Sequence, residues 1–280
     1  MKQLLAGRLK LEIHPSREVA GAAAARAAAE ELRGLGRLGK DIAVIFATGA
    51  SQVETLAALT SIPDLPWERV QGFHMDEYIG LDANHPASFR RYLREKLTQR
   101  VALCEFFEID GNARDIESFS RAYTRRLDLA APQLCLLGIG ENGHLAFNDP
   151  SEADFSDPQA MKVVTLDDVC RQQQVAEGWF KSRGEVPRQA LTLTIPSLFR
   201  VPKLIVSVPG IRKAEVIRRT VEEPIVTDCP STILRTHPDA TVYLDADSAA
   251  RLSDLFLNEQ DQARTIEDRP AEGECDERKG

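Results

Sequence analysis

The sequence is poor in cysteine, carries no excess of positive charge and has no long apolar run. Its five cysteines are scattered and odd in number, and none has C-x-x-C spacing. Neither a disulfide framework nor a zinc site follows, and a reducing cytoplasm is expected. No run approaches the roughly 18 apolar residues of a membrane span. A formal charge of −8 argues against nucleic acid as a partner, because binding phosphates requires clustered Lys and Arg.

What is present is typical of a soluble globular chain, with 43% hydrophobic and 28% charged residues among 280. Short β-rich runs alternate with stretches of helical spacing. This predicts a doubly wound α/β fold, in which a mostly parallel, modified Rossmann-like sheet has helices on both faces. We expect one domain over residues 1–257 and a charged, disordered tail over 258–280. The expected strands are Ile42–Phe46, Val70–His74, Glu105–Ile109, Leu134–Leu137, Val163–Leu166, Leu204–Val208 and Thr241–Leu244.

The most informative stretch is 138–150, which follows the predicted strand Leu134–Leu137. It contains three glycines, which relax the backbone, and it places His144 between an amide, Asn142, and a carboxylate, Asp149. A histidine at the carboxyl end of a parallel strand lies where open α/β folds bind their ligands. With polar groups on both sides to fix its tautomer, His144 is a candidate acid/base.

A second stretch, Ala47–Ser51, follows the predicted strand Ile42–Phe46. Ser51 and Glu54 have the spacing of a capping box, which predicts that a helix begins at Ser51. A strand, a glycine-containing turn and a helix N-terminus together form an anion site, although such turns are also common without one. There is no Walker lysine and no G-x-G-x-x-G, so nucleotide binding is not indicated.

Charged residues also follow two other predicted strands. Asp76 and Glu77 come just after Val70–His74, which suggests either one carboxylate directed into a cleft or two that merely solvate a loop. Lys213 follows Leu204–Val208. It is either an ordinary surface lysine or a point charge placed to bind a phosphate.

Together these segments resemble the glucosamine-6-phosphate deaminase/isomerase family, which shares its fold with the 6-phosphogluconolactonases. The resemblance covers roughly residues 10–257. It is strongest in Met75–Tyr78 with Gly80-Leu81 and His85-Pro86, and in residues 140–144 with 147–150. The lactonase branch carries G-P-D-G-H instead, which this chain lacks, so the deaminase side is closer.

The resemblance implies isomerisation and deamination of an amino-sugar phosphate, from glucosamine 6-phosphate to fructose 6-phosphate and ammonia. It implies that His144 opens the sugar ring while Asn142 and Asp149 orient and polarise its imidazole. Asp76 matches the family's enolisation base, which moves the C2 proton. Neither a metal nor a cofactor is expected. The implied substrate-binding residues, which would hold the phosphate, are Thr48, Gly49, Ala50, Ser51 and Lys213.

The chain also departs from the family pattern. Asp149 stands where the family usually carries Glu, so its carboxylate is one methylene shorter and is expected to reach His144 only through a water. Typical deaminases place an Arg in a mobile segment that closes over the phosphate, whereas this chain has Ala176 or Glu177 near that place. Arg171 is a candidate substitute. Loss of a bidentate phosphate clamp weakens binding or shifts specificity.

Three functions therefore stay open. The first is an amino-sugar-phosphate deaminase/isomerase. The second is a sugar-phosphate lactonase such as a 6-phosphogluconolactonase, which would keep His144 but would not require Asp76. The third is a catalytically weak sugar-phosphate-binding homologue, suggested by the missing arginine. The sequence does not decide between a monomer and a homo-oligomer, and it identifies no allosteric site.

Overall fold

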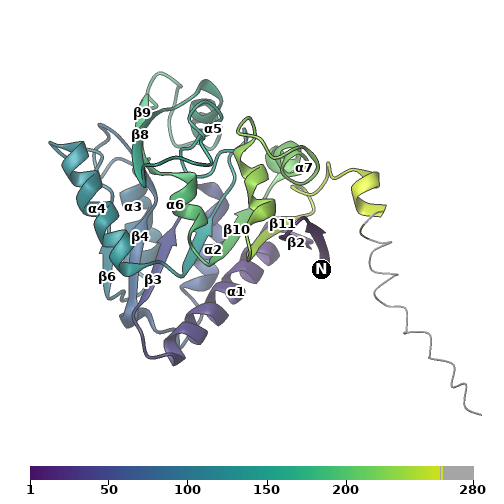
Figure 1. Ribbon diagram of the computed structural model, residues 1–280, viewed down its shortest axis with the longest axis horizontal. Coiled ribbons are helices and arrows are strands. Elements are labelled where there is room, and N and C mark those ends of the chain that lie inside the picture. The colour runs from purple at the N-terminus through teal and green to yellow at the C-terminus, as the bar shows by residue number, and fades with distance from the viewer. Residues whose placement is uncertain (259, 261–280) are drawn as a thin grey trace, which may run out of the picture.

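An eight-stranded sheet forms the centre of the computed structural model, which describes residues 1–258 and 260 (Figure 1). Its strand order is β1-β2-β11-β10-β7-β3-β4-β6, and among the described residues every pair but β1–β2 is parallel. The predicted tail lies almost wholly outside the described residues. The strands are β1 (Lys2–Ala6), β2 (Leu9–His14), β3 (Ile42–Phe46), β4 (Val70–His74), β6 (Glu105–Phe107), β7 (Leu134–Leu137), β10 (Lys203–Val208) and β11 (Ala240–Asp245).

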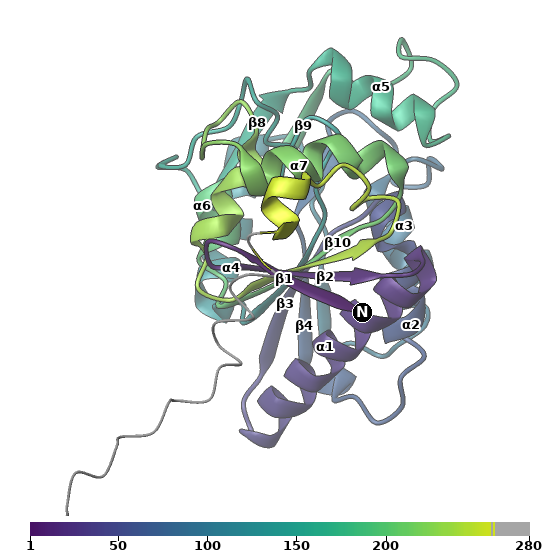
Figure 2. The same ribbon diagram turned by 90° about the vertical axis from the view of Figure 1, so that its right-hand side faces the viewer.

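Helices cover both faces of this sheet, and Figure 2 shows α1 on one side and α6 and α7 on the other. Side chains of a strand alternate between faces. Val44 of β3 packs in the cluster of buried residues formed with α1, α2 and α3, whereas Ile45 packs in the cluster formed with α4, α6 and α7. The predicted doubly wound α/β fold is therefore confirmed. The helices are α1 (Arg17–Arg37), α2 (Val53–Leu59), α3 (Phe89–Leu93), α4 (Ile116–Ala130), α6 (Ile195–Phe199) and α7 (Ala214–Glu222).

A smaller antiparallel sheet stands above one end of the large one, together with α5 (Asp168–Ala176) (Figure 1). Its strand order is β5 (Asp76–Tyr78), β9 (Gln189–Leu193) and β8 (Met161–Thr165). The predicted strand Val163–Leu166 was expected in the parallel sheet, and that expectation is wrong, because its first three residues lie on the antiparallel strand β8 and Leu166 follows that strand. In β8, Met161 and Val164 are buried whereas Val163 and Thr165 are exposed, so this strand is partly solvated, unlike the strands of the large parallel sheet.

The predicted helix start at Ser51 is also wrong. Ala50–Gln52 form a 3₁₀ turn, and α2 follows it without a side-chain cap. Glu54 instead pairs with Arg17 of α1, with 2.8 Å between Oε1 and Nε, so its carboxylate is not available to close a capping box. The remaining short turns are 3₁₀ at Trp67–Arg69, Ile211–Lys213 and Pro230–Thr236, and a π-helical extension of α3 at Arg94–Thr98.

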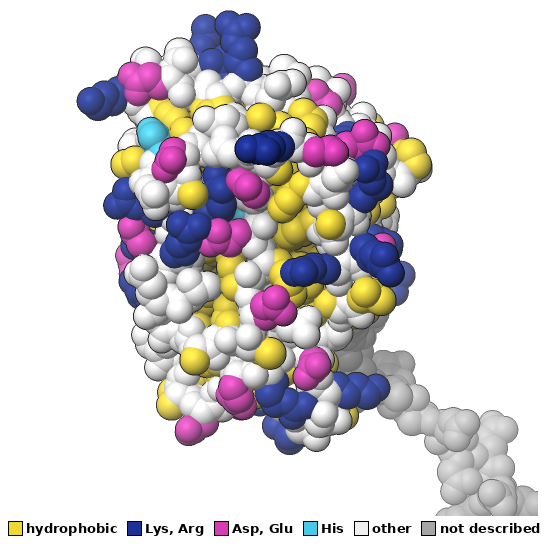
Figure 3. All heavy atoms as spheres, turned by 90° about the vertical axis from the view of Figure 1, so that its left-hand side faces the viewer, with side chains coloured by type: hydrophobic (Ala, Val, Ile, Leu, Met, Phe, Trp, Pro, Cys, Tyr) yellow, Lys and Arg dark blue, Asp and Glu magenta, His cyan; other side chains and the backbone are white. Residues whose placement is uncertain are grey.

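Charge is mixed on the surface. On the face in Figure 3, Lys and Arg side chains are interspersed with Asp and Glu and do not gather into one basic patch. Within the described part of the chain, no helix combines the length and the apolar character needed to span a bilayer.

Candidate active site

The site lies where the strand order of the large sheet reverses. From β3 the chain runs outward to β4 and β6, and it then returns to place β7 on the opposite side of β3. The loops that leave two such strands diverge and open a crevice at their carboxyl ends. Here these loops are Ala47–Ser51 after β3 and residues 138–144 after β7. A hydrogen bond of 3.0 Å from Ala47 N to Leu136 O joins them at the point of departure.

A small cavity of about 70 Å³ occupies this crevice. It brings together all five predicted substrate-binding residues and two of the four predicted catalytic residues. Helix α5 contributes the wall that faces these loops. The polar and charged side chains in its lining are Thr48, Ser51, Asp76, His144, Gln173, Gln174, Glu177 and Lys213.

His144 lies flat against the backbone of Gly140. A Cβ added at Gly140 would lie 2.2 Å from two atoms of the imidazole ring, so only glycine fits beneath the ring. Nδ1 of His144 is 3.0 Å from Oδ1 of Asp149, an ion-pair distance, although the angle at Nδ1 is too poor for a hydrogen bond. The expectation that Asp149 reaches His144 only through a water is therefore wrong, because the loop brings the shorter side chain into direct contact.

Asn142 acts on Asp149 rather than on the imidazole. Its Nδ2 donates to Oδ1 of Asp149 at 3.0 Å and to Asp167 at 2.9 Å, while its Oδ1 accepts from the backbone N of His144 at 3.1 Å. Asn142 therefore contacts Asp149 and the backbone of His144, so its predicted effect on the orientation of the ring would be indirect. Burial opposes the charge of Asp149, but the adjacent imidazole of His144 and the hydrogen bonds from Asn142 and the Asp167 amide outweigh this effect and hold the pKa of Asp149 below its ordinary value.

Asp167 is a functional candidate that was not predicted. It caps α5, with Oδ1 accepting from the backbone N of Cys170 at 2.6 Å, and its own amide donates to Asp149 Oδ2 at 3.0 Å. An Asp before a stretch of helical spacing is a recognisable N-cap signal, but its proximity to Asp149 depends on the tertiary fold.

Asp76 is buried in β5 and forms part of the cavity wall, and its Oδ1 has no hydrogen-bond partner among the described residues. Burial, followed by the charge of Glu77, raises the pKa of Asp76 well above its ordinary value. Neither acid merely solvates a loop. Glu77 is fully buried and lies outside the cavity lining, where its Oε2 accepts from Ser88 Oγ and from the backbone N of Arg90, both at 2.9 Å.

Lys213 provides the positive charge of the cavity. Its side chain is buried, and neither a hydrogen bond nor an ion pair involves its ammonium among the described residues. Burial lowers its pKa, an effect that the carboxylates of Glu177 and Glu141 oppose. The preceding turn is fixed by Gly210, which has φ of 95° and donates its N–H to Asp245. A buried, unpaired ammonium facing a cavity is suited to an anionic ligand.

The segment that should carry a phosphate-binding arginine carries a carboxylate. Glu177 lines the cavity and accepts from Gln173 at 2.7 Å and from Trp179 Nε1 at 3.1 Å. Arg171, the candidate substitute, points elsewhere. Its guanidinium binds the carbonyl oxygens of Arg183 and Val186, and it does not line the cavity.

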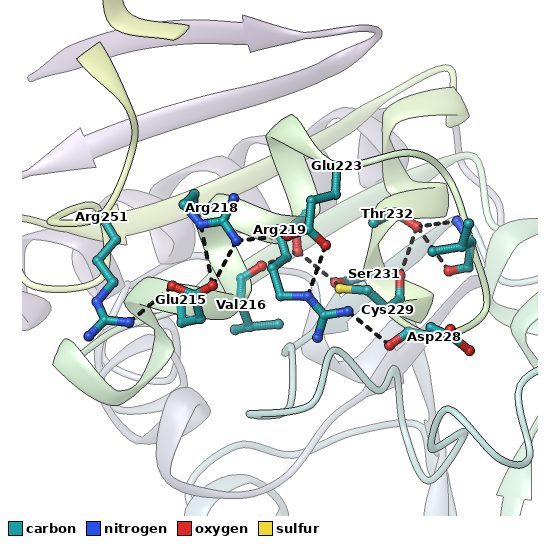
Figure 4. Close-up of polar contacts among 12 residues, drawn as sticks. Glu215, Val216, Arg218, Arg219, Glu223, Asp228, Cys229, Ser231, Thr232 and Arg251 are labelled. Atoms are coloured by element: carbon teal, nitrogen blue, oxygen red, sulfur yellow. Dashed lines mark hydrogen bonds and ion pairs between the residues drawn. The ribbon is translucent and has the colours of Figure 1, made fainter. Parts of the chain in front are cut away.

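Helix α7 and the segment that follows it support the loop that carries His144. Figure 4 shows Ser231 and Cys229 of this segment beside α7, where Ser231 Oγ lies 2.6 Å from Thr220 Oγ1. The backbone N of Ser231 donates to the carbonyl oxygen of Gly143 at 2.8 Å. Gly143 has φ of 93°, and a Cβ there would lie 2.8 Å from Cys229 Sγ, so the close approach requires glycine.

Comparison with known proteins identifies the family. Residues 15–243 match the model of the family described as glucosamine-6-phosphate isomerases/6-phosphogluconolactonase. The chain belongs to this family. A glucosamine-6-phosphate deaminase from Listeria monocytogenes is 34% identical over 207 residues, which is 74% of this chain and 86% of that protein. A second protein of that name, from Geobacillus, is 35% identical over 191 residues, 67% of this chain and 74% of its own length.

Solved structures agree with this assignment. A monomeric glucosamine-6-phosphate deaminase aligns with a TM-score of 0.78 and 29% identity, covering 86% of this chain and 99% of its own. The 6-phosphogluconolactonase from Thermotoga maritima aligns with a TM-score of 0.68 and 17% identity over 84% of this chain and 98% of its own. At that identity the second likeness shows the common fold alone.

Proposed function

We propose that this protein is a glucosamine-6-phosphate deaminase, which converts glucosamine 6-phosphate and water to fructose 6-phosphate and ammonia. The observation that carries the proposal is that Asp76, His144 and Lys213, from separate parts of the chain, all line one cavity. The names of the relatives at 34–35% identity support the same activity. In a lactonase, which acts on an ester, the buried carboxylate of Asp76 would have no evident task.

His144 is proposed to open the sugar ring. Ring opening delivers a proton to the ring oxygen and removes one from the anomeric hydroxyl. An imidazole does both when one nitrogen faces the substrate and the other is held by a carboxylate. With Nδ1 beside Asp149, Nε2 lies on the other side of the ring and is available to the ligand. The lowered pKa of Asp149 keeps its carboxylate ionised, so that it stabilises the imidazolium that forms.

Asp76 is proposed to transfer the proton from C2 to C1 of the opened sugar. Its unpartnered oxygen is free to accept a proton, and a carboxylate that is poorly solvated is a stronger base than one in water. Removal of the C2 proton gives an enolamine, and delivery of that proton to C1 gives an imine at C2. Water then adds to C2, and the nitrogen leaves as ammonia. Lys213 and the amides of the Thr48–Ser51 loop are proposed to bind the phosphate.

The raised pKa of Asp76 predicts the pH profile of this reaction. The base must be ionised in the free enzyme, so kcat/KM should fall as the pH decreases through the pKa of Asp76. Because burial raises that pKa, the fall should occur above the range near 4 of an ordinary aspartate. A profile of kcat/KM between pH 4 and 9 tests this, and activity that is constant down to the ordinary range would contradict Asp76 as the base.

An ammonia-release assay over a panel of sugar phosphates tests the function itself. Glucosamine 6-phosphate should release ammonia, and fructose 6-phosphate should appear in equal amount. Hydrolysis of 6-phosphogluconolactone without ammonia release would favour the lactonase instead. Binding without turnover of any member of the panel would favour a sugar-phosphate-binding protein, for which the carboxylate of Glu177 in place of an arginine is the supporting observation.

We also propose a cytoplasmic location. The four cysteines that the structure describes are all free thiols, which fits a reducing compartment.

A further inference from the structure

One buried group beside the candidate active site has no task in the proposed reaction. Cys170, in the first turn of α5, is fully buried, and its thiol lies close to the carboxylate of Asp149. The ligand atoms of His144, Asp149 and Cys170 all lie within 4.8 Å of one another. We propose that these three side chains form a binding site for a divalent cation of the Zn²⁺ type, and that a cation bound there inhibits the enzyme.

The ligand set fits the chemistry of Zn²⁺. This ion binds imidazole nitrogen, carboxylate oxygen and thiolate sulfur at 2.0–2.3 Å, commonly with three protein ligands and one open position. Ligand atoms around such an ion are separated by somewhat over 3 Å, so the present spacing needs only small side-chain shifts. His144 Nδ1 is buried and makes no hydrogen bond among the described residues. It is therefore available as a ligand.

The site also balances charge and has a route of entry. On binding, the Cys170 thiol loses its proton to solvent, and the thiolate and the Asp149 carboxylate together neutralise the two charges of the cation. Burial raises the pKa of Cys170, so the lost proton makes binding stronger as pH rises. The cation reaches the cluster through the cavity that His144 lines. The cluster is already held in place by hydrogen bonds, because Asn142 bonds to Asp149, to Asp167 and to the backbone N of His144.

Inhibition follows from the identity of the ligands. An imidazole whose Nδ1 binds a cation, and whose carboxylate partner is taken by the same cation, no longer exchanges protons with the substrate near neutral pH. This consequence depends on the proposed deaminase function, whereas binding of the cation does not. The two can therefore be tested separately.

Binding is tested on the full chain with Zn²⁺ by calorimetry and with Co²⁺ by absorption spectroscopy. The wild-type protein should bind one Zn²⁺, and Co²⁺ should give a thiolate-to-metal charge-transfer band in the near ultraviolet. Cys170→Ser should remove that band and weaken Zn²⁺ binding by more than about tenfold, the loss that even an outer partner of a metal site causes. Cys229→Ser, which alters another buried free thiol, is the matched control and should keep both.

The proposal is overturned if wild-type protein shows no cobalt–thiolate band, or if the band is lost in Cys229→Ser and kept in Cys170→Ser. If Cys170→Ser does not fold, Cys170→Ala and the wild-type spectrum still decide the question.

For inhibition, each variant is compared with its own metal-free rate. Zn²⁺ should inhibit the wild type reversibly with chelator, and Cys170→Ser should require at least about ten times more Zn²⁺. Equal sensitivity of the two would overturn the inhibitory role, and an inactive wild type would refute the function without affecting the binding result.

Discussion

Burial of Asp76 gives this residue opposite effects on activity and on stability. A carboxyl group whose pKa is raised by folding binds its proton more tightly in the native state than in the unfolded chain. The stabilisation that comes from this tighter proton binding is fully present at a pH below the pKa that Asp76 has in the unfolded chain. It is lost as the pH rises through the higher pKa of the folded state. At neutral pH the unfolded chain has an ionised, well-solvated Asp76. Folding must either bury that charge or bind a proton to it, and both lower the free energy of unfolding.

Asp76→Asn should therefore be inactive and more stable. Loss of the base should lower kcat by about 10²–10⁴-fold in the ammonia assay. At pH 7 the variant should unfold at a higher temperature than the wild type, with roughly 2–4 °C for each kcal/mol gained in a domain of this size. The difference should disappear at low pH, where Asp76 is protonated in both states. Equal melting temperatures of the variant and the wild type from pH 3 to pH 8 would mean that burial does not raise the pKa of Asp76.

Gly140 provides a separate test of the position of His144. In Gly140→Ala the new Cβ would collide with the imidazole ring, so the ring must move. A displacement of about 1 Å of a proton-transferring group costs on the order of 10²-fold in rate, whereas overpacking destabilises by about 1–3 kcal/mol. We expect kcat of Gly140→Ala to fall on the order of 10²-fold, while circular dichroism shows that the variant stays folded. Gly184→Ala, in open surroundings, is the control, and equal activity of both variants would argue against this placement of the ring.

The residues of the site differ in how far the sequence alone could predict them. His144, Asn142 and Asp149 lie within eight positions in one loop, so a local motif contains them all. Asp167 could not be predicted in this way, because its approach to Asp149 depends on how α5 docks. The direct contact between Asp149 and His144 was missed for a related reason: side-chain length alone did not reveal how tightly the loop folds.

Close packing of two helices positions the loop that is proposed to bind phosphate. Helix α1 approaches α2 at Gly21, where a Cβ would lie 2.5 Å from the Cβ of Glu54 and 3.0 Å from its backbone carbonyl carbon. A backbone neighbour cannot rotate away as a flexible side chain can. Because α2 directly follows the Thr48–Ser51 loop, a shift of α2 is transmitted to the cavity.

Gly21→Ala should consequently push α1 and α2 apart. Overpacking of this kind costs about 1–3 kcal/mol, which urea denaturation measures as a lower midpoint. Gly34→Ala, on the same helix but with its nearest neighbour 3.9 Å away, should instead gain about 0.5–1 kcal/mol from its higher helix propensity. If both substitutions stabilise the protein, the inference that α1 and α2 pack too closely at Gly21 to admit a Cβ is wrong.

At the level of elements, the parallel strands were predicted more accurately than the antiparallel ones. Strands β3, β4 and β7 match their predicted bounds. Strands β3 and β7 are continuous apolar runs that are buried on both faces, and β4 is mostly buried although it contains Gln71 and His74. Strands β1, β2, β5 and β9 were not predicted. Strand β5 has only three residues and contains Asp76 and Glu77, so composition suggested a loop, and only pairing with β9 makes it a strand.

At the level of the whole molecule, the order of the strands decides where the site lies. Alternation of strands and helices predicts a doubly wound sheet, but it does not say which strands are neighbours. Only the observed adjacency of β3 and β7 brings the Thr48–Ser51 loop next to the His144 loop. The small sheet then adds Asp76 from above. The site therefore exists only when the Thr48–Ser51 loop, the His144 loop and the small sheet are assembled in the folded chain. Binding of a ligand that contacts all three tests this arrangement.

A substrate that contacts all three parts should stabilise the molecule as a whole. In the inactive Asp76→Asn protein, glucosamine 6-phosphate at 100 times its Kd should add about 2.7 kcal/mol to the free energy of unfolding, seen as a higher melting temperature. Adding Lys213→Met should abolish most of that shift. It should also raise the melting temperature without ligand, because burial lowers the pKa of Lys213 and its protonated form therefore opposes folding at neutral pH. An undiminished ligand shift in the double variant would show that the phosphate binds elsewhere on the molecule.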